Sequence, residues 1–276
     1  MVVSDKRPCV LVFAGHDPSG GAGIQADIEA IGAQGAHAIS IITVLTVQDN
    51  NRVQAVFPVS PTLIRAQFDA IVAQVPIAAV KLGILGSMQN AKLVVDCIEQ
   101  LRQTHAQLPV VVDTVLASGH GDPLSQQDPV QILELVLPFA TLITPNLPEL
   151  RRLLEHDPSS VDDESRAAKL SDRFACDVLL KGGHAEGDGV SNSWFQPSTA
   201  TLSRQKTTWH WPRLPGEFHG SGCTLAAAIA GQFALGHNAA HALSRAQEYT
   251  QECLKHAYAI AEGQSIPSRN PIQKVV

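Results

Sequence analysis

Short apolar runs alternate with amphipathic stretches along most of this chain. Continuous runs such as Cys9–Ala14 (CVLVFA) and Pro109–Asp113 (PVVVD) are typical of parallel strands that are covered on both faces. Further strands are expected at 38–44, 78–82, 140–144 and 178–181, with a short extended piece at 53–57. The segments 190–195 and 199–209 are expected to form an antiparallel excursion around a turn at Gln196-Pro197.

Stretches with apolar residues every three or four positions separate these runs and predict helices. They cover 24–35, 62–75, 87–104, 127–137, a segment that opens at Asn146, a segment after Gly222, and 239–261. Pro61 suits a helix start and Ser87 suits an N-cap. About eight strands thus alternate with about eight helices. We expect one doubly wound α/β domain over residues 1–276, with a mostly parallel central sheet, helices on both faces and an irregular tail from about residue 263.

Composition and charge narrow the class of protein. Of the 276 residues, 45% are hydrophobic and 17% charged, and the formal net charge is −6, so no nucleic-acid surface is expected. The five cysteines form no CxxC pair and are interpreted as reduced thiols of a cytoplasmic protein. The N-terminal apolar run is interpreted as a first strand instead of a signal peptide, and no run is long enough to span a membrane.

The stretch FHGSGCTLAAAI, residues 218–229, carries the strongest chemical signal. Gly220, Ser221, Gly222 and Cys223 lead directly into an alanine-rich helix, so their backbone N–H groups can converge on one anion. The partial positive charge of the helix start favours a phosphate and also a thiolate at Cys223. The alternative for Cys223 is a small buried hydrophobic residue at a helix contact.

A second glycine-rich loop, Gly20–Gly23, also precedes a helix, and charged residues follow three predicted strands. These residues are Asp113, Glu149 and Lys181. Because the carboxyl ends of parallel strands share one edge of a sheet, the combination favours a site that binds a polyphosphate and a second small molecule. Such a site is typical of phosphoryl transfer, which needs positioning and charge neutralisation more than covalent chemistry.

Other types of site fit the sequence less well. Residues 21–26 satisfy G-x-G-x-x-A, but the preceding strand ends near Ala14 and the next strand lacks the acid that would bind a ribose. No G-x-x-x-x-G-K-[ST] loop occurs. A Cys/His hydrolase built on His219 and Cys223 is conceivable, although residues four apart across a glycine turn seldom align as nucleophile and base. The eleven histidines show no metal-ligand spacing.

Seven segments, in order along nearly the whole chain, resemble one family. They are AGHDPSGGAGIQAD (14–27), VLTVQDN (44–50), VKLGILGS (80–87), VVVDTVLASGHGDPL (110–124), ITPNLPE (143–149), LKGGH (180–184) and HGSGCTLAAAIA (219–230). The chain resembles the hydroxymethylpyrimidine/phosphomethylpyrimidine kinases of thiamine biosynthesis, members of the ribokinase-like group. The resemblance implies an ATP- and Mg²⁺-dependent kinase with a central, mostly parallel sheet.

The resemblance also implies roles for individual residues. It makes Cys223 the catalytic base, with a lowered pKa, beside an anion hole formed by Gly220, Ser221 and Gly222. The pyrimidine would be bound by Asp27, Gln48, Ile84, Val115, Gly15 and Gly23. ATP and its phosphates would be bound by Lys181, Asp113 and Asn146, and Mg²⁺ would be held mostly through water by Glu149 and Asp113. For Asn146 and Glu149 the alternative is a capped helix, and for Lys181 a surface lysine.

Three departures from the family pattern bear on the reaction. Family members commonly carry a lysine in the loop after the D-x-V segment, whereas this chain has Ser118-Gly119-His120-Gly121. Ile84 stands where a methionine is usual, and residues 264–276 lack the usual glycine- and histidine-rich motif. The missing lysine leaves open whether both successive phosphorylations occur.

The expected reaction is phosphorylation of the hydroxymethyl group of 4-amino-5-hydroxymethyl-2-methylpyrimidine, followed by phosphorylation of its monophosphate. One alternative is a pyridoxal or pyridoxine kinase, whose substrate is also a flat ring with a CH₂OH arm. The other is a catalytically poor binding or regulatory protein that keeps the pyrimidine pocket. A homodimer is expected, with an interface on an exposed apolar face that includes Trp194, Trp209 and Trp211. The other interpretation is that these indoles cover the sheet edge. A loop is expected to close over the site and exclude water.

Overall fold

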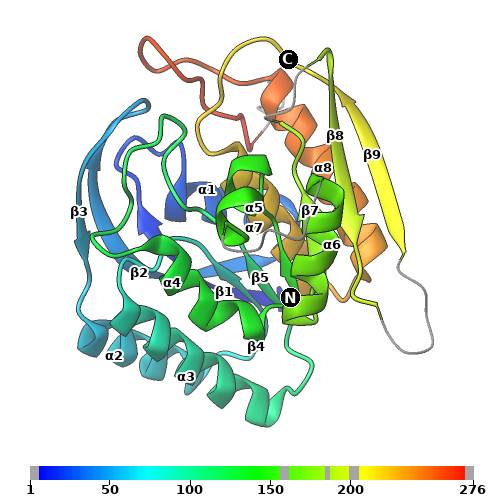
Figure 1. Cartoon of the computed structure of the whole chain (residues 1–276). Coiled ribbons are helices and arrows are strands. Elements are labelled where there is room, and N and C mark those ends of the chain that lie inside the picture. Colours follow the sequence, from blue (N-terminus) through cyan, green and yellow to red (C-terminus); the bar gives the residue numbers. More distant parts are fainter. Residues whose placement is uncertain (1–5, 156–161, 184–186, 199–204, 271–276) are drawn as a thin grey trace, which may run out of the picture.

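The computed structural model describes residues 6–155, 162–183, 187–198 and 205–270. Within these ranges nine strands form a single sheet in the order β3-β2-β1-β4-β5-β6-β7-β8-β9 (Figure 1). The strands are β1 (Cys9–His16), β2 (His37–Gln48), β3 (Val53–Pro58), β4 (Ile77–Leu82), β5 (Val110–Val112), β6 (Leu142–Ile143), β7 (Asp177–Leu180), β8 (Gly189–Phe195) and β9 (Lys206–Pro212). The six strands in the middle of this order, β2, β1, β4, β5, β6 and β7, are parallel to one another. Strand β3 is antiparallel to β2, β8 is antiparallel to β7, and β9 is antiparallel to β8. The expected mostly parallel sheet is confirmed.

Helices cover both faces of this sheet, as expected. They are α1 (Gly23–Ala33), α2 (Pro61–Val72), α3 (Met88–Thr104), α4 (Pro129–Val136), α5 (Leu147–Leu153), α6 (Asp163–Phe174), α7 (Ser221–Ala234) and α8 (Ala239–Lys255). Pro61 is the first residue of α2, and the Ser87 side chain caps α3 by accepting the N–H of Asn90, so both predicted helix starts are confirmed. Within the described ranges, no helix offers an apolar stretch of the length that crossing a bilayer requires.

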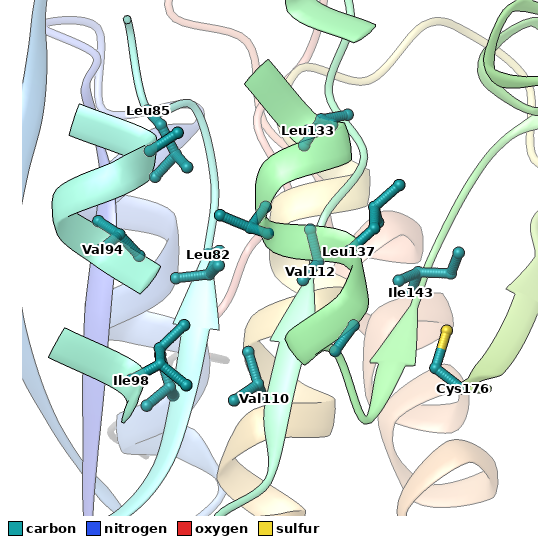
Figure 2. Close-up of a cluster of buried hydrophobic side chains, with 14 of the residues drawn as sticks. Leu82, Leu85, Val94, Ile98, Val110, Val112, Leu133, Leu137, Ile143 and Cys176 are labelled. Carbon is teal, nitrogen blue, oxygen red and sulfur yellow. The ribbon is translucent and has the colours of Figure 1, made fainter. Parts of the chain in front are cut away.

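Two hydrophobic cores, one on each face of the sheet, hold the two layers of helices against it. Helices α2 to α6 pack on one face, where Figure 2 shows Val94 and Ile98 of α3 and Leu133 of α4 against Val110 and Val112 of β5. On the other face, α1, α7 and α8 cover the opposite side chains of the same strands. The central strands β1, β4 and β5 are therefore apolar on both faces, which explains their continuous hydrophobic runs.

Two helices differ from the expectation. Helix α6 was missed because its sequence, DESRAAKLSDRF, turns only a narrow stripe of Ala167, Ala168 and Leu170 into the core. Helix α8 ends at Lys255 and not at Ala261. The chain turns there because the Tyr258 N–H pairs with the Ile266 carbonyl in a β-bridge, which a continued helix would prevent.

The expected apolar face of three tryptophans is not exposed. Trp194 is 8% exposed and packs in the core beneath α7 and α8, with Trp209 stacked on it at a ring distance of 6.5 Å. The Trp211 indole N–H donates to Gln247 Oε1 on α8. The indoles therefore cover the antiparallel end of the sheet: Trp194 is buried, and Trp209 and Trp211 are half-buried, so the three do not form an exposed apolar face.

Candidate active site

A cavity of about 910 Å³ opens at the carboxyl ends of the parallel strands. Its walls include His16 at the end of β1, Gln48 at the end of β2, Asp113 after β5 and Lys181 after β7. The predicted residues that line it are Gly15, Gly23, Gln48, Ile84, Asp113, Val115, Asn146, Glu149, Lys181, Gly220, Ser221, Gly222 and Cys223. Of the candidate residues, Asp27 does not line the cavity.

The two glycine-rich loops meet at the start of α7. Gly220, the N-cap of α7, has a left-handed φ of +82°, and a Cβ at this position would collide with the carbonyl oxygen of Gly21. A Cβ at Gly21 would in turn collide with the His219 ring. No side chain caps α7, so its first N–H groups face the cavity with the positive end of the helix dipole. This geometry suits an anion.

Cys223 lies in the first turn of α7, partly exposed to the cavity. Burial raises the pKa of its thiol to about 12, and repulsion from Asp113 adds to the rise, while the Lys81 ammonium opposes it. The expected low pKa is therefore wrong, because desolvation of a thiolate outweighs the field of one helix end. Among the charges around the thiol, the Lys81 ammonium is the largest that favours a thiolate.

Lys181 lies between two acids, close to the start of α7. Its Nζ lies 3.4 Å from Asp113 Oδ1 and 4.0 Å from Glu149 Oε2. Burial raises the pKa of Asp113, but Lys181 and Lys81 outweigh it and hold this pKa below its ordinary value. Burial also raises the pKa of Glu149, which stays elevated at about 7 despite Lys181. The pair therefore presents one firmly ionised carboxylate and one that titrates near neutrality.

Asn146 and Glu149 form a capping box at the start of α5. The Asn146 side chain accepts the Glu149 N–H at 2.9 Å, and Glu149 Oε2 accepts the Asn146 N–H at 2.8 Å and the Thr114 hydroxyl at 3.1 Å. The capped-helix alternative thus holds, yet both residues also line the cavity. The box fixes the Glu149 carboxylate where it faces Lys181.

A metal ion would find few protein ligands here. Asp113 Oδ2 is buried and has no hydrogen-bond partner in the structure, which suits an oxygen that a cation or its water would contact. No cluster of three or more His, Cys, Asp or Glu side chains among the described residues could hold a metal ion alone. One orphaned carboxylate oxygen beside Glu149 fits Mg²⁺, which keeps several waters and takes further ligands from phosphates.

Asp27 lies beneath the cavity in a buried ion pair. Lys81 Nζ lies 2.8 Å from Asp27 Oδ1 and 2.9 Å from Oδ2, and neither side chain is exposed to solvent. Burial raises the pKa of Asp27 to about 6, and Lys81 counteracts that rise. Asp27 therefore faces Lys81, and it is Lys81 that lines the cavity. Sequence reasoning missed Lys81, although a lysine in the apolar strand IAAVKL was a visible signal.

A second buried pair joins the glycine-rich loops. His219 Nε2 lies 2.7 Å from Asp17 Oδ2, and Asp17 also accepts the backbone N–H groups of Ser19 and Ala22. His219 thus uses a ring nitrogen to bind the first loop, which does not favour the hydrolase interpretation. Asp17 and His219 were not predicted as site residues, and no local pattern relates them.

The Ser118–Gly121 loop is held in place from two sides. Arg52 donates to Asp122 at 2.6 Å, and Asp122 also accepts the Val53 N–H, which holds the Ser118–Gly121 turn against the start of β3. Gln264 Nε2 packs directly over Gly119. This loop, which lacks the lysine that the family commonly has, lines the cavity together with Gln264.

Comparisons with known proteins agree with this geometry. The profile of the phosphomethylpyrimidine kinase family matches residues 17–268. The hydroxymethylpyrimidine/phosphomethylpyrimidine kinase of Escherichia coli K12 is 34% identical over 270 residues, which cover 95% of this chain and 96% of that protein. A thiamine biosynthesis multifunctional protein of Corynebacterium glutamicum is 32% identical, and the chain spans 34% of its length. An ADP complex of Bacillus subtilis pyridoxal kinase has a TM-score of 0.79 and 28% identity, and the match covers 96% of this chain and 98% of that one. The expected ribokinase-like fold is confirmed.

Proposed function

The chain belongs to the phosphomethylpyrimidine kinase family, and from that premise we propose that it transfers the γ-phosphate of ATP within this cavity. The acceptor is the hydroxymethyl group of 4-amino-5-hydroxymethyl-2-methylpyrimidine, and then the phosphate of the resulting monophosphate. The E. coli relative bears both activities in its name, and the ADP complex of the B. subtilis structure supports ATP as the donor.

One observation carries the proposal: the start of α7, Cys223 and the Lys181–Asp113 pair face one cavity whose other end carries Gln48. The backbone N–H groups at the helix start would bind the transferred phosphoryl group where its charge develops. Lys181 would contact phosphate oxygens. Gln48 offers both a donor and an acceptor to an aminopyrimidine edge, between Ile84 and Val115.

Cys223 would accept the proton of the attacking alcohol. Because burial raises the pKa of the thiol to about 12, the sulfur would first have to lose its own proton to solvent, so only its small thiolate fraction would act as the base. The proposal therefore assigns Lys81 a supporting role, since its ammonium lines the cavity and favours the thiolate. In a loose phosphoryl-transfer transition state the alcohol loses its proton late, so a weakly populated base is compatible with turnover.

Mg²⁺ would be held by Asp113 and Glu149, mostly through water. It would supply charge neutralisation to the phosphate oxygens. Asp113 contributes its orphaned Oδ2, and the capping box with Asn146 orients Glu149. With a pKa of about 7, Glu149 would bind the hydrated ion more strongly in its ionised form, above neutrality.

Release of ADP with each candidate alcohol tests the proposal. We expect turnover of the pyrimidine alcohol, and a fall in kcat of about 10²- to 10⁴-fold in Cys223→Ala with little change in affinity for the alcohol. Cys97→Ala, which changes a buried cysteine of α3, is the matched control and should keep its activity. Equal kcat in Cys223→Ala and wild type would remove Cys223 from the mechanism. Binding of the alcohol without turnover in the wild type would favour the regulatory alternative.

A pyridoxal kinase is the second candidate, and the likeness to the B. subtilis structure favours it. Pyridoxal is also a flat ring with a CH₂OH arm, so the same anion site would serve. Turnover of pyridoxal without turnover of the pyrimidine alcohol would establish this candidate. Phosphate transfer to the pyrimidine monophosphate, followed separately, tests whether the Ser118–Gly121 loop supports the second step without a lysine.

Two broader expectations also stay proposals. The exposed side chains Leu45 and Val47 on β2 and Phe57 on β3 support a homodimer, because they form one apolar face on paired strands. Sedimentation of the wild type and of Phe57→Ser would test it, and a monomeric wild type would contradict it. The five cysteines are free in the structure, which supports a reducing compartment such as the cytoplasm.

A further inference from the structure

Arg269 follows α8 in the segment expected to be an irregular tail, yet it is 1% exposed and is among the largest fully buried side chains of the protein. Its guanidinium reaches the place where the two glycine-rich loops meet. We propose that Arg269 is a positioning residue for phosphoryl transfer: it holds the first glycine-rich loop against the start of α7 and so keeps the anion site preformed. The inference rests on the proposed kinase function.

The contacts of the guanidinium connect both loops. It donates to the carbonyl oxygens of Gly20, at 3.3 Å, and Gly21, and its Nε donates to the Thr224 hydroxyl at 2.8 Å. That hydroxyl donates in turn to the Gly220 carbonyl at 2.8 Å. One arginine and one hydroxyl group thus set the orientation of peptide groups on both sides of the site.

These peptide groups need an external support. Gly20 and Gly220 both adopt left-handed φ values, of 76° and 82°, and neither has a side chain that could anchor it. The Gly21 carbonyl that Arg269 contacts is also the atom against which Gly220 packs without room for a Cβ. A rotation of the Gly21 peptide would therefore push on the N-cap of α7. The planar fork of arginine can bind several carbonyls at fixed angles, which a lysine cannot do.

Arg269 is itself held firmly in place. The Tyr249 hydroxyl of α8 donates to the carbonyl oxygen of Arg269 at 2.8 Å. The N–H of the preceding residue, Ser268, donates to the carbonyl oxygen of Cys253 at 3.0 Å. Glu29 of α1, at 3.3 Å, supplies the opposite charge. The guanidinium lies outside the set of residues that line the cavity. It therefore acts on the reaction through the loops and not by touching a substrate.

Chemical rescue tests this role against a merely structural one. We expect Arg269→Ala to lower kcat on the order of 10²-fold, the scale of a misplaced site, with a small change in the KM for the alcohol. Guanidinium ion at low millimolar concentration should restore part of kcat, whereas ammonium should not. Arg102→Ala is the matched control, because Arg102 also donates to two backbone carbonyls, those of Leu108 and Phe139, away from the cavity. Its kcat should stay near that of wild type.

A second pair of variants keeps the proposal testable if Arg269→Ala does not fold. Thr224→Val removes the hydroxyl that links Arg269 to Gly220, and Thr224→Ser keeps it. We expect kcat to fall in the valine variant and to be retained in the serine variant. Wild-type kcat in folded Arg269→Ala or in Thr224→Val, or equal rescue by ammonium, would overturn the proposal. An inactive wild type would instead contradict the kinase function itself.

Discussion

The buried pair of Asp27 and Lys81 allows a quantitative prediction. Neither side chain is exposed, and Lys81 Nζ lies 2.8 Å from Asp27 Oδ1. Asp27→Asn or Lys81→Met leaves one buried charge without its partner, which costs about 3–5 kcal/mol of the free energy of unfolding. At roughly 2–4 °C per kcal/mol for a chain of this size, the melting temperature should fall by roughly 6–20 °C.

The double variant Asp27→Leu/Lys81→Met separates stability from function. Replacing both charges by apolar groups removes the unpaired charge, so the free energy of unfolding should return to within about 1–2 kcal/mol of wild type. Activity should not return, because Lys81 is the cation that opposes the raised pKa of the Cys223 thiol. Urea unfolding followed by tryptophan fluorescence, together with ADP release, measures the two effects.

The pH dependence of the pair gives a further check. The folded protein raises the pKa of Lys81 above its ordinary value: burial lowers it, but Asp27, Cys223 and Asp113 together more than compensate. The contribution of the Lys81 ammonium to the free energy of unfolding is therefore complete at neutral pH. It is lost in alkaline solution, as pH rises through the pKa that Lys81 has in the folded protein. A loss below about 1 kcal/mol in both single variants, or wild-type kcat in the double variant, would refute the reasoning.

Three further predictions concern the cavity. Gly220→Ala should abolish most activity because its Cβ would meet the Gly21 carbonyl. Gly236→Ala is the control, because Gly236 has a similar φ of 83° but no atom within 4 Å of a Cβ. It should lower the free energy of unfolding by only about 1–2 kcal/mol and leave kcat unchanged. Wild-type affinity for Mg²⁺, titrated by activity, should weaken as pH falls below about 7 through protonation of Glu149, and Glu149→Gln should show no such change. The wild-type rate should rise with pH, and Cys223→Asp, with a base already ionised, should flatten that rise; parallel profiles would contradict it.

Much of the fold could be predicted because local and tertiary signals agree. The apolar runs of β1, β4 and β5 are buried on both faces, so their sequence shows burial without reference to any partner. Helix starts at Pro61 and Ser87 depend on contacts within one turn. Helix α6 could not be predicted in this way because its mostly charged sequence buries only a narrow stripe of residues. The end of α8 depends on a bridge to residue 266 that no local pattern marks.

The candidate residues of the cavity lie where strand ends and glycine turns place them, and the residues that sequence reasoning missed are held there by contacts between distant parts of the chain. Lys81 pairs with a residue 54 positions away, and Arg269 contacts the first loop across 248 positions. Contacts between residues so far apart in the chain leave no periodic pattern in the sequence. A lone lysine in a buried strand is nevertheless informative, because its ammonium must find an acid or a ligand when water is excluded.

The pKa of Cys223 shows why position in a helix does not determine chemistry. A helix start lowers a thiol pKa through partial charges that act over one turn, and this local argument predicted a thiolate. Burial acts in the opposite direction on the same sulfur, and the neighbouring Asp113 adds to it. Since Asp113 also pairs with Lys181, a phosphate or Mg²⁺ that engages either group would change the charge seen by the thiol. The protonation state of Cys223 is therefore coupled to whatever engages Asp113 or Lys181, and if Cys223 is the base as proposed, an anion or cation bound there would change its pKa.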